Sequence, residues 1–292
     1  MRHPIVAGKF YPATESGCRS HLARVDAAVV AIEGLPERLV AAIVPHAGWD
    51  CSGHVAMEVY RTAAPRVPAE ATLVVFGAVH RFGVARASVC TLGGWETPIG
   101  PMRTDQPLAE LLLAKGGGLL IADSDAHVSE HSIEVQMPML RLVFGDRLMV
   151  AIAAPPRADS HEVGRLAAEI AGKAGREIFV IGTTDLTHYG ATGYDFAPKG
   201  SGAEALKWVK EENDARMVEL MRRMKAEEAL TEARSRQNAC GAGAIAATLG
   251  AARQLGATRG FLVDYTTSYD VLKDQLYGNR IGDFVGYAGM LF

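Results

Sequence analysis

The chain has 292 residues, a length within the range of one large α/β unit. Its 30 Lys and Arg nearly balance its 33 Asp and Glu, and because the basic residues form no stripe, nothing in the charge favours nucleic-acid binding. No apolar run approaches the roughly 20 residues needed to cross a bilayer, and the first residues lack a signal-peptide core. We therefore expect a single domain over residues 1–292 that is cytoplasmic and contacts neither nucleic acid nor membrane.

The first half of the chain alternates helix and strand signals after an irregular loop at residues 7–12. Thr104 is a candidate helix cap, because Pro107 follows in the first turn and a glycine run follows the apolar positions. In chain order we predict a helix at 16–32, a strand at 39–44, a short helix at 54–62, strands at 73–76 and 87–92, and a helix that begins after Thr104 and ends before residues 116–118.

The second half continues the alternation. Pro138 should kink or break a helix that follows a polar loop at 123–131, Asp159 with Glu162 has capping-box spacing, and Asn238 is a candidate cap. In chain order we predict a helix at 133–144, a strand at 148–153, a helix at 159–171, a strand at 178–181, a loop at 190–202 that is a candidate lid, a charged solvated helix at 204–233, a helix at 239–255, and strands at 261–265 and 284–290.

This order of elements favours a three-layer αβα fold with a mostly parallel central sheet. Three strands, at 39–44, 73–76 and 178–181, are short continuous apolar runs bounded by turn residues, which is typical of buried parallel strands. Ligands bind beyond the carboxyl ends of such strands. Polar segments ending in His46, His80 and His188 follow these three strands, so we expect one shared polar site.

His46 and His80 are the sharpest pair of candidate ligands, because each follows a buried strand among small residues. Neutral imidazole is a common ligand of Fe, Cu and Zn. The alternative is that both rings merely cap strand ends through hydrogen bonds. Two such rings on separate strands, beside a third polar strand end, favour a binding site.

Cys240 lies at a predicted helix N-terminus, where the helix dipole and free amides stabilise a thiolate. The alternative is a small buried residue in a helix rich in Ala and Gly. Asp185 and His188 share one loop, three residues apart, and an aspartate beside a histidine can fix its tautomer and raise its basicity. The alternative is an aspartate that caps the turn.

Glu130 and His131 precede a predicted helix and, read with His127, spell the inverted zinc-protease signature His-x-x-Glu-His. That signature needs one continuous helix, whereas the residues up to Ser129 have the composition of a loop. Glu134 is a candidate to line a polar pocket or to satisfy loop amides.

Three aromatic residues could wall a pocket for an aromatic ligand, although packing in the core or at its rim is their more usual role. They are Trp49, Trp95 and Tyr189.

Taken together, eight short motifs in the same order resemble the Memo family, whose bacterial and archaeal branch is called AmmeMemoRadiSam system protein B. The motifs are Ala7-Gly8-Lys9-Phe10-Tyr11, Pro45-His46-Ala47-Gly48, Gly77-Ala78-Val79-His80, Thr97-Pro98-Ile99-Gly100, Glu130-His131-Ser132-Ile133-Glu134, Thr184-Asp185-Leu186-Thr187-His188-Tyr189, Cys240-Gly241 and Val285-Gly286-Tyr287-Ala288.

The resemblance implies a fold like that of the class III extradiol dioxygenases, with His46, His80 and Cys240 as metal ligands. It implies an acid/base or supporting role for Asp185 and His188. Glu130 and His131 would lie near the same pocket, with Trp49 and Tyr189 as further candidate pocket residues. Four positions depart from the family pattern: Trp49, Ala78, Arg81 and Ala242. Ala242 replaces a basic residue, which argues against phosphate recognition.

The function implied is a non-haem Fe(II) oxidoreductase of dioxygenase type that acts on a small aromatic or heterocyclic molecule. Cu and Zn are alternative metals, because imidazole and thiolate suit all three. A non-catalytic module that binds a peptide or partner protein and a copper-binding redox protein are the alternative functions. The family name implies association with AMMECR-type and radical-SAM proteins.

Overall fold

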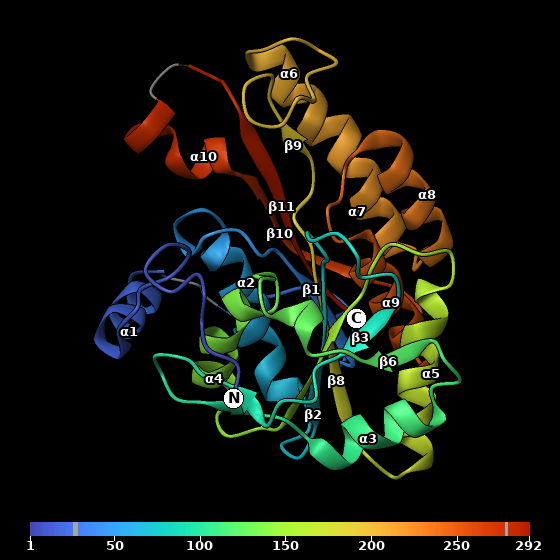
Figure 1. The fold of residues 1–292 in the computed structure, drawn as a ribbon. Coiled ribbons are helices and arrows are strands. Elements are labelled where there is room, and N and C mark those ends of the chain that lie inside the picture. The colour runs from blue at the N-terminus through green and yellow to red at the C-terminus, as the bar shows by residue number, and fades with distance from the viewer. Residues whose placement is uncertain (26–28, 278–279) are drawn as a thin grey trace.

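The computed structural model describes residues 1–25, 29–277 and 280–292. Within these residues the strands of the main sheet follow the order β10-β11-β1-β8-β2-β7-β3-β6, and β9 pairs with β11 (Figure 1). The strands are β1 (Ala41–Val44), β2 (Thr72–Gly77), β3 (Ala87–Val89), β6 (Leu120–Ala122), β7 (Met149–Ala153), β8 (Ile178–Thr183), β9 (His188–Tyr189), β10 (Phe261–Thr267) and β11 (Phe284–Leu291). A separate hairpin joins β4 (Gly94–Trp95) to β5 (Met102–Arg103).

The centre of the sheet is parallel, as the sequence predicts. β1 pairs with β8, β8 with β2 and β2 with β7, all in parallel register. The flanking strands add antiparallel pairs, because β11 runs against β1, β9 and β10, and β3 runs against β7. The four central strands are fully buried, which explains why their sequences are continuous apolar runs.

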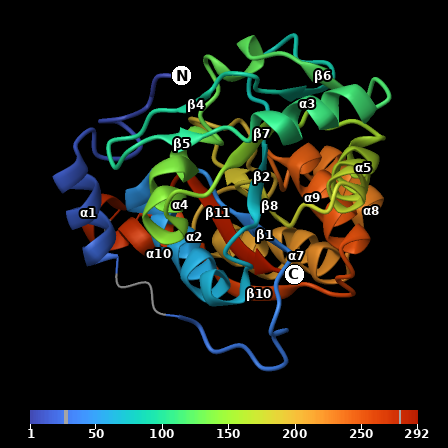
Figure 2. The same ribbon diagram turned by 90° about the horizontal axis from the view of Figure 1, so that it is seen from below.

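Helices cover both faces of this sheet (Figure 2). One face carries α1, α2 and α4, and the other carries α3, α5, α7, α8 and α9. The helices are α1 (Glu15–Arg24), α2 (Trp49–Ala63), α3 (Gln106–Lys115), α4 (Met137–Phe144), α5 (Ser160–Lys173), α6 (Ala203–Trp208), α7 (Asp214–Arg222), α8 (Ala226–Arg236), α9 (Ala242–Gln254) and α10 (Ser268–Leu272). Short turns are η1 (Ala64–Arg66), η2 (Asp125–His127) and η3 (Glu134–Gln136), which are 3-10, and η4 (Val209–Asn213) and η5 (Lys273–Tyr277), which are π.

Alternation along the central strands builds two separate cores. Ile43 of β1 packs into the core on the α5 and α9 side, whereas its neighbours Ala42 and Val44 pack into the core on the α2 and α4 side. This is the expected result when successive side chains point to opposite faces of a sheet. The three-layer αβα prediction is therefore confirmed.

Glycine lets α5 and α9 pack at close range. A Cβ on Gly164 would lie 1.7 Å from the backbone oxygen of Ala247, and one on Gly250 would lie 2.0 Å from that of His161. The two helices thus touch through their backbones, which fixes α9 and the Cys240-Gly241 turn that precedes it against the sheet.

Several predicted helix ends are wrong, for local reasons. The predicted helix at 16–32 ends at Arg24, while its residues 26–28 lie outside the described part of the chain and residues 29–32 are not helical. α2 begins at Trp49 rather than residue 54, directly after the turn that follows β1. Of the two roles predicted for Pro138, a kink or a break, the structure shows the break, because η3 ends at Gln136 and Pro138 lies in the first turn of α4.

Three predicted caps also differ from the structure. Asp105, one residue after Thr104, accepts the Leu108 amide and caps α3. Asp159 occupies the cap position of α5, but its carboxylate pairs with Arg157, so the capping box does not form. Asn238 is buried with its side-chain amide on the carbonyl of Asn213, and Gly241 precedes α9 instead.

The charged stretch predicted as one solvated helix at 204–233 is divided into α6, η4, α7 and α8. One side of it is buried, including Val209, Met217 and Asp214. The candidate lid at 190–202 is held at its base, because Gly190 and Phe196 exchange two backbone hydrogen bonds at 3.0 Å. No helix in the described ranges is both long and apolar enough to cross a membrane.

Candidate metal centre

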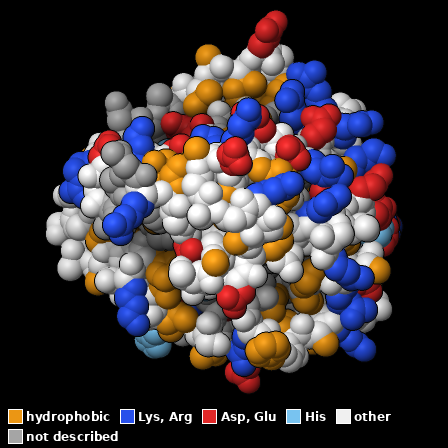
Figure 3. Space-filling view, turned by 90° about the horizontal axis from the view of Figure 1, so that it is seen from above, with side chains coloured by type: hydrophobic (Ala, Val, Ile, Leu, Met, Phe, Trp, Pro, Cys, Tyr) orange, Lys and Arg blue, Asp and Glu red, His pale blue; other side chains and the backbone are white. Residues whose placement is uncertain are grey.

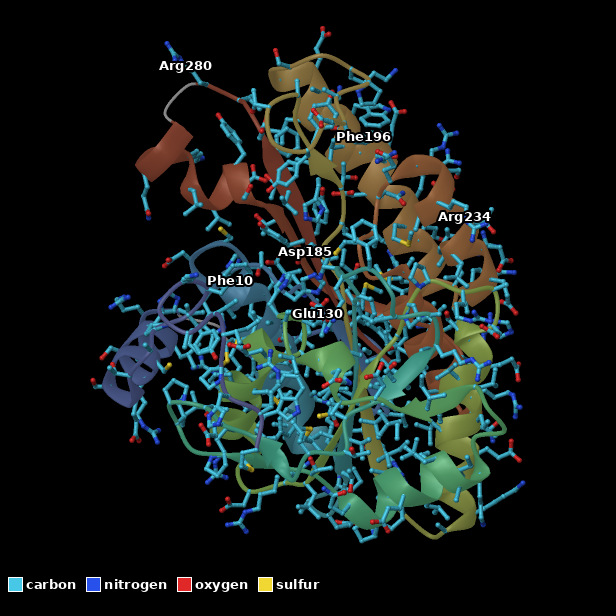
Figure 4. The ribbon with its side chains drawn as sticks, viewed as in Figure 1. Phe10, Glu130, Asp185, Phe196, Arg234 and Arg280 are labelled. Carbon is cyan, nitrogen blue, oxygen red and sulfur yellow. The ribbon has the colours of Figure 1, made fainter. Side chains whose placement is uncertain are left out.

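The carboxyl ends of β1, β2 and β8 bring the predicted histidines to one place. His46 follows β1, His80 follows β2, and the turn after β8 carries Asp185. Figure 4 labels Asp185 and Glu130, both of which lie toward the middle of the molecule in that view. On the face seen from above, basic and acidic side chains are interspersed (Figure 3), so neither sign of charge dominates there.

Three imidazoles form the first group of candidate ligands. One ligand nitrogen each from His46, His80 and His131 lies within 4.8 Å of the other two. The rings of His80 and His131 stack at 4.7 Å, and both stand nearly perpendicular to His46. His131 comes from the loop before η3, and the sequence had placed it only as a pocket residue.

The second group shares His46 with the first. It adds Asp185 and Cys240, with the Cys240 Sγ 3.2 Å from His46 Nε2 and an Asp185 oxygen 3.9 Å from the same nitrogen. The predicted set of His46, His80 and Cys240 is thus divided between two overlapping groups among the described residues.

Hydrogen bonds at the far nitrogens orient the two strand-end rings. His46 Nδ1 lies 3.1 Å from the Thr183 hydroxyl, and His80 Nδ1 lies 3.0 Å from a Glu130 oxygen. Nε2 of each ring is therefore the nitrogen left for a metal ion. Proteins commonly support metal-binding histidines in this way, with a carboxylate or another hydrogen-bonding group behind the ring.

Glu130 is the organising carboxylate of the imidazole side. Its oxygens accept the backbone amides of His80, His131 and Ser132 at 2.7–2.9 Å in addition to the His80 ring. Burial opposes its charge, but the hydrogen bonds and charge of His80, with the amides, outweigh burial and lower the pKa of Glu130. Burial likewise opposes the charge of His80, and Glu130 outweighs it to raise the pKa of His80.

The pKa values of His46 and His131 are lowered, whereas that of His80 is raised. Burial, followed by the neighbouring imidazoles, lowers the pKa of His46 well below its usual range. Burial and then His80 lower the pKa of His131. Both rings are therefore neutral at physiological pH, which is the form that binds a metal ion. His46 is fully buried, whereas the side chains of His80 and His131 are 34% and 25% exposed, so the centre opens on their side.

Cys240 precedes α9 by two residues, so its sulfur lies in the turn before the helix rather than in its first turn. Its sulfur accepts the Asp185 amide at 3.3 Å. Burial, followed by the nearby Asp185 carboxylate, raises the pKa of the thiol. The polypeptide alone thus favours the protonated thiol, and a cation would have to displace that proton to bind sulfur.

Asp185 makes hydrogen bonds to the backbone of His46 and Ala47. Its Oδ1 accepts the backbone amides of His46 at 2.8 Å and Ala47 at 3.3 Å, and burial raises its pKa. His188 instead directs Nδ1 to the Leu186 carbonyl at 3.1 Å. The hydrogen bond at Nδ1 of His188 is therefore made to a backbone carbonyl rather than to Asp185, whose carboxylate interacts electrostatically with the ring.

The structure does not bring the predicted aromatic residues to the imidazoles. Trp49 is enclosed beside Tyr11 and His21, and its indole donates to the Val135 carbonyl. Tyr189 stacks on Phe284 at 5.2 Å and belongs to a small aromatic cluster at the base of the 190–202 loop.

Trp95 is likewise buried, with the Arg2 guanidinium over its ring. The aromatic groups nearer the centre are Phe10, whose ring edge meets His131 at 5.0 Å, and Tyr194, which meets His188 at 4.9 Å.

The zinc-protease interpretation is also wrong. His127 is buried in the turn η2, and its Nε2 donates to the Ser88 carbonyl at 2.8 Å. Glu130 is engaged by His80, so neither residue takes the role that the signature assigns.

Sequence reasoning missed the contribution of the first residues. Buried Arg2 donates to Glu134 at 2.7 Å and to the carbonyls of His127 and Glu130, so it braces the loop that carries His131. Glu134 also accepts the amides of Ile5 and Val6, which agrees with its predicted role in satisfying loop amides. No local pattern marks this role of Arg2, because these three partners lie more than 120 positions away.

Comparisons with known proteins agree with this architecture. The profile of the family described as "Memo-like protein" matches residues 2–291. A MEMO1 family protein of Methanopyrus kandleri is 32% identical over 300 residues, which cover 100% of this chain and 98% of that protein. A MEMO1 family protein of Methanosarcina barkeri is 33% identical over 299 residues, which cover 100% and 99%.

Among solved structures, the crystal structure of an uncharacterized protein from Escherichia coli K12 has a similar fold. Its TM-score is 0.52 at 15% sequence identity, and the match covers 85% of this chain and 99% of that chain. At this identity the likeness concerns the fold alone. The family profile and the relatives, which match over the whole length, identify this chain as a member of the Memo family.

Proposed function

We propose that this protein is a metal-dependent oxidoreductase of dioxygenase type that holds Fe(II) with His46, His80 and Cys240 and acts on a small aromatic or heterocyclic molecule. The observation that carries the proposal is the support behind the rings: Thr183 and Glu130 engage Nδ1 of His46 and His80, so both Nε2 atoms remain for a cation. The Cys240 sulfur lies beside one of them. Imidazole with one thiolate fits Fe, Cu and Zn, and all the donors are present.

Bound iron would supply Lewis-acid and redox chemistry toward O2 and an oxidisable substrate. The protein's own contribution is orientation and proton transfer. Asp185 fixes the His46-Ala47 backbone, and His188, whose Nδ1 is directed to a carbonyl, keeps Nε2 free to accept a proton from a substrate hydroxyl. His131, stacked on His80, is the candidate for a further ligand or a second proton carrier.

Elemental analysis of protein purified without oxygen tests the metal assignment. Iron should be present in proportion to the chain, and His46→Ala and Cys240→Ala should each lose it while the far-ultraviolet circular dichroism remains unchanged. His161→Ala is the matched control. His161 lies in α5 and pairs with Glu162 and Glu227, so this variant should keep its full metal content. Normal iron in both site variants would refute the proposal.

The variant His131→Ala decides between the two groups of ligands. If Cys240 completes the ligand set, His131→Ala keeps the metal; if the three imidazoles form the site, it loses the metal and Cys240→Ala keeps it. Oxygen uptake with a panel of catechols and hydroxylated heterocycles then tests the reaction, and uptake must disappear in His188→Ala without loss of metal.

Copper binding is the second candidate, and one contact favours it. Thiolate and imidazole are suitable ligands for Cu(I), and the Cys240 sulfur lies 3.2 Å from His46 Nε2. Copper in the anaerobic preparation, retained without oxygen uptake on any substrate, would favour this function over the dioxygenase.

A further inference from the structure

The turn after β8, residues 184–187, carries Asp185 and leads into His188 at the start of β9, and its backbone is held from one side by β11. The Leu186 amide donates to the Gly286 carbonyl at 2.8 Å, and the Gly286 amide donates to the Thr187 carbonyl at 3.0 Å. His188 then pairs with Val285. These bonds fix one side of the turn and leave the amide and hydroxyl of Thr187 to another partner.

That partner is Asp214, which is fully buried at the start of α7. Its Oδ1 accepts the Thr187 amide at 3.0 Å and also the Thr187 hydroxyl, and its Oδ2 accepts the Tyr265 hydroxyl at 2.8 Å. The preceding residue, Asn213, donates to the Thr187 hydroxyl at 2.9 Å. Asp214 and Asn213 thus both bind Thr187, the residue between Leu186 and His188.

Two local features allow Asp214 to approach the turn. The π turn η4 ends at Asn213, and π turns inside helices frequently occur at functional sites. Gly286 lies against the carboxylate, because a Cβ there would be 1.9 Å from Asp214 Oδ2. A side chain at position 286 would displace Asp214 from its place between β11 and the turn.

The hydrogen bonds of Asp214 and Asn213 to Thr187 affect the ring of His188. Its Nδ1 lies 3.1 Å from the Leu186 carbonyl, which can only accept, so Nδ1 carries the proton. In a neutral imidazole the other nitrogen is then an acceptor, and the bond at one nitrogen decides which tautomer is present. The position of the Leu186 carbonyl therefore sets the tautomer of His188.

We infer that Asp214 is a positioning residue, which holds Thr187 so that the Leu186 carbonyl keeps the proton of His188 on Nδ1 and leaves Nε2 as the proton acceptor. The inference deepens the proposed function, since it rests on His188 as the acid/base residue. It concerns a property of the polypeptide alone, so it can be measured without metal or substrate.

The test is long-range proton–nitrogen NMR of the full chain with labelled histidine, treated with chelator and kept at a pH where the imidazoles are neutral. The chain has nine histidines, and the signals of His188 are assigned by their absence in His188→Ala. The wild type should show His188 protonated on Nδ1. Asp214→Ala should show a mixture of tautomers, whereas Asp214→Asn, which keeps an oxygen acceptor for the Thr187 amide, should retain the wild-type pattern.

The matched control is Asp105→Ala. Asp105 is also fully buried and hydrogen-bonded, but to Thr72, Arg176 and the Leu108 amide at the opposite end of the sheet. It should lower stability without changing the tautomer of His188. An unchanged tautomer in Asp214→Ala, or an equal change in Asp105→Ala, would overturn the inference.

If Asp214→Ala does not fold, two milder variants take its place. Thr187→Val removes the hydroxyl that both Asp214 and Asn213 contact and should shift the tautomer, whereas Tyr265→Phe, which removes only the contact at Oδ2, should not. An unshifted Thr187→Val would contradict the inference. Failure of the iron analysis would leave these tautomer results intact, and an unchanged tautomer would leave the iron result intact, so the two proposals fail separately.

Discussion

Glu130 and Asp214 are both buried carboxylates that hold a turn beside the candidate centre, yet their pKa values move in opposite directions. Glu130 accepts the His80 ring and three backbone amides, and its pKa is lowered. Asp214 accepts two hydroxyls and one amide, and burial raises its pKa to about 6. Burial raises the pKa of both groups, and the donors decide how far it is opposed: the His80 ring and three amides outweigh burial at Glu130, whereas two hydroxyls and one amide do not at Asp214.

Removal of Glu130 should have the largest effect. Glu130→Ala leaves the His80 ring and three backbone amides without their acceptor, and each buried donor left unsatisfied costs about 1–3 kcal/mol of unfolding free energy. Urea denaturation measures it. The control is Glu96→Ala, whose exposed pair with His3 should contribute less than about 1 kcal/mol. Equal losses of unfolding free energy in the two variants would mean that the hydrogen bonds to Glu130 stabilise the fold no more than an exposed ion pair does.

The pH dependence of stability should differ in sign between the two carboxylates. The pKa of Glu130 in the folded protein lies below 4.5, so its stabilisation is present above pH 4.5 and is lost as the pH falls. The pKa of Asp214 rises from 3.8 to about 6, so its stabilisation is present below 3.8 and is lost as the pH rises through about 6.

The difference for Asp214 amounts to about 3 kcal/mol, at about 1.4 kcal/mol per pKa unit. Asp214→Asn should therefore gain up to that amount relative to wild type between about pH 4 and pH 7, whereas Glu130→Gln should lose relative to wild type as the pH rises toward 4.5 and keep a constant deficit above it. Denaturation curves at a series of pH values measure both. If the unfolding free energies of the two variants changed in the same way with pH, the two carboxylates would not differ in the sign of their pKa shifts.

Gly286→Ala should have the next largest effect, because its Cβ would meet the Asp214 carboxylate at 1.9 Å. Forcing a methyl group into a packed site costs about 1–3 kcal/mol. Gly282→Ala is the control in the same segment, since a Cβ there meets nothing within 4 Å, and its effect should stay within about 0.5 kcal/mol. Thermal and urea denaturation compare the pair, and equal stability would show that Asp214 moves aside freely.

Tyr265→Phe should have the smallest effect. It removes one of the hydrogen bonds to Asp214 and should cost about 1 kcal/mol near neutral pH. The loss should shrink at acid pH, where Asp214 is protonated and the bond no longer involves a charge. A loss that is larger in acid would contradict the assignment of Asp214 as a group that is charged at neutral pH.

The sequence predicts best where the signal is local. Continuous apolar runs identify the central strands, and the polar residues that follow them place His46 and His80 at one edge of the sheet. The carboxyl ends of parallel strands must meet there, so this part of the site follows from strand type alone.

The parts that the sequence does not predict depend on distant contacts. Asp214 lies in a run of charged residues that is typical of a solvated helix, and it is buried only because Thr187 and Tyr265 meet it across the fold. Thr104 and Asp105 are both good caps, and only the packing of α3 against the sheet selects Asp105. Asp185 and His188 have a spacing that permits contact, but the backbone carbonyl of Leu186 occupies the ring nitrogen.

The separation of the site residues along the chain has a consequence for biosynthesis. His46 and Cys240 touch across 194 positions, and Arg2 and Glu134 across 132. During translation His46 therefore leaves the ribosome long before Cys240. Arg2 likewise emerges long before its partner Glu134 has been made. Any cation that this thiol helps to hold must be acquired after Cys240 itself has been translated.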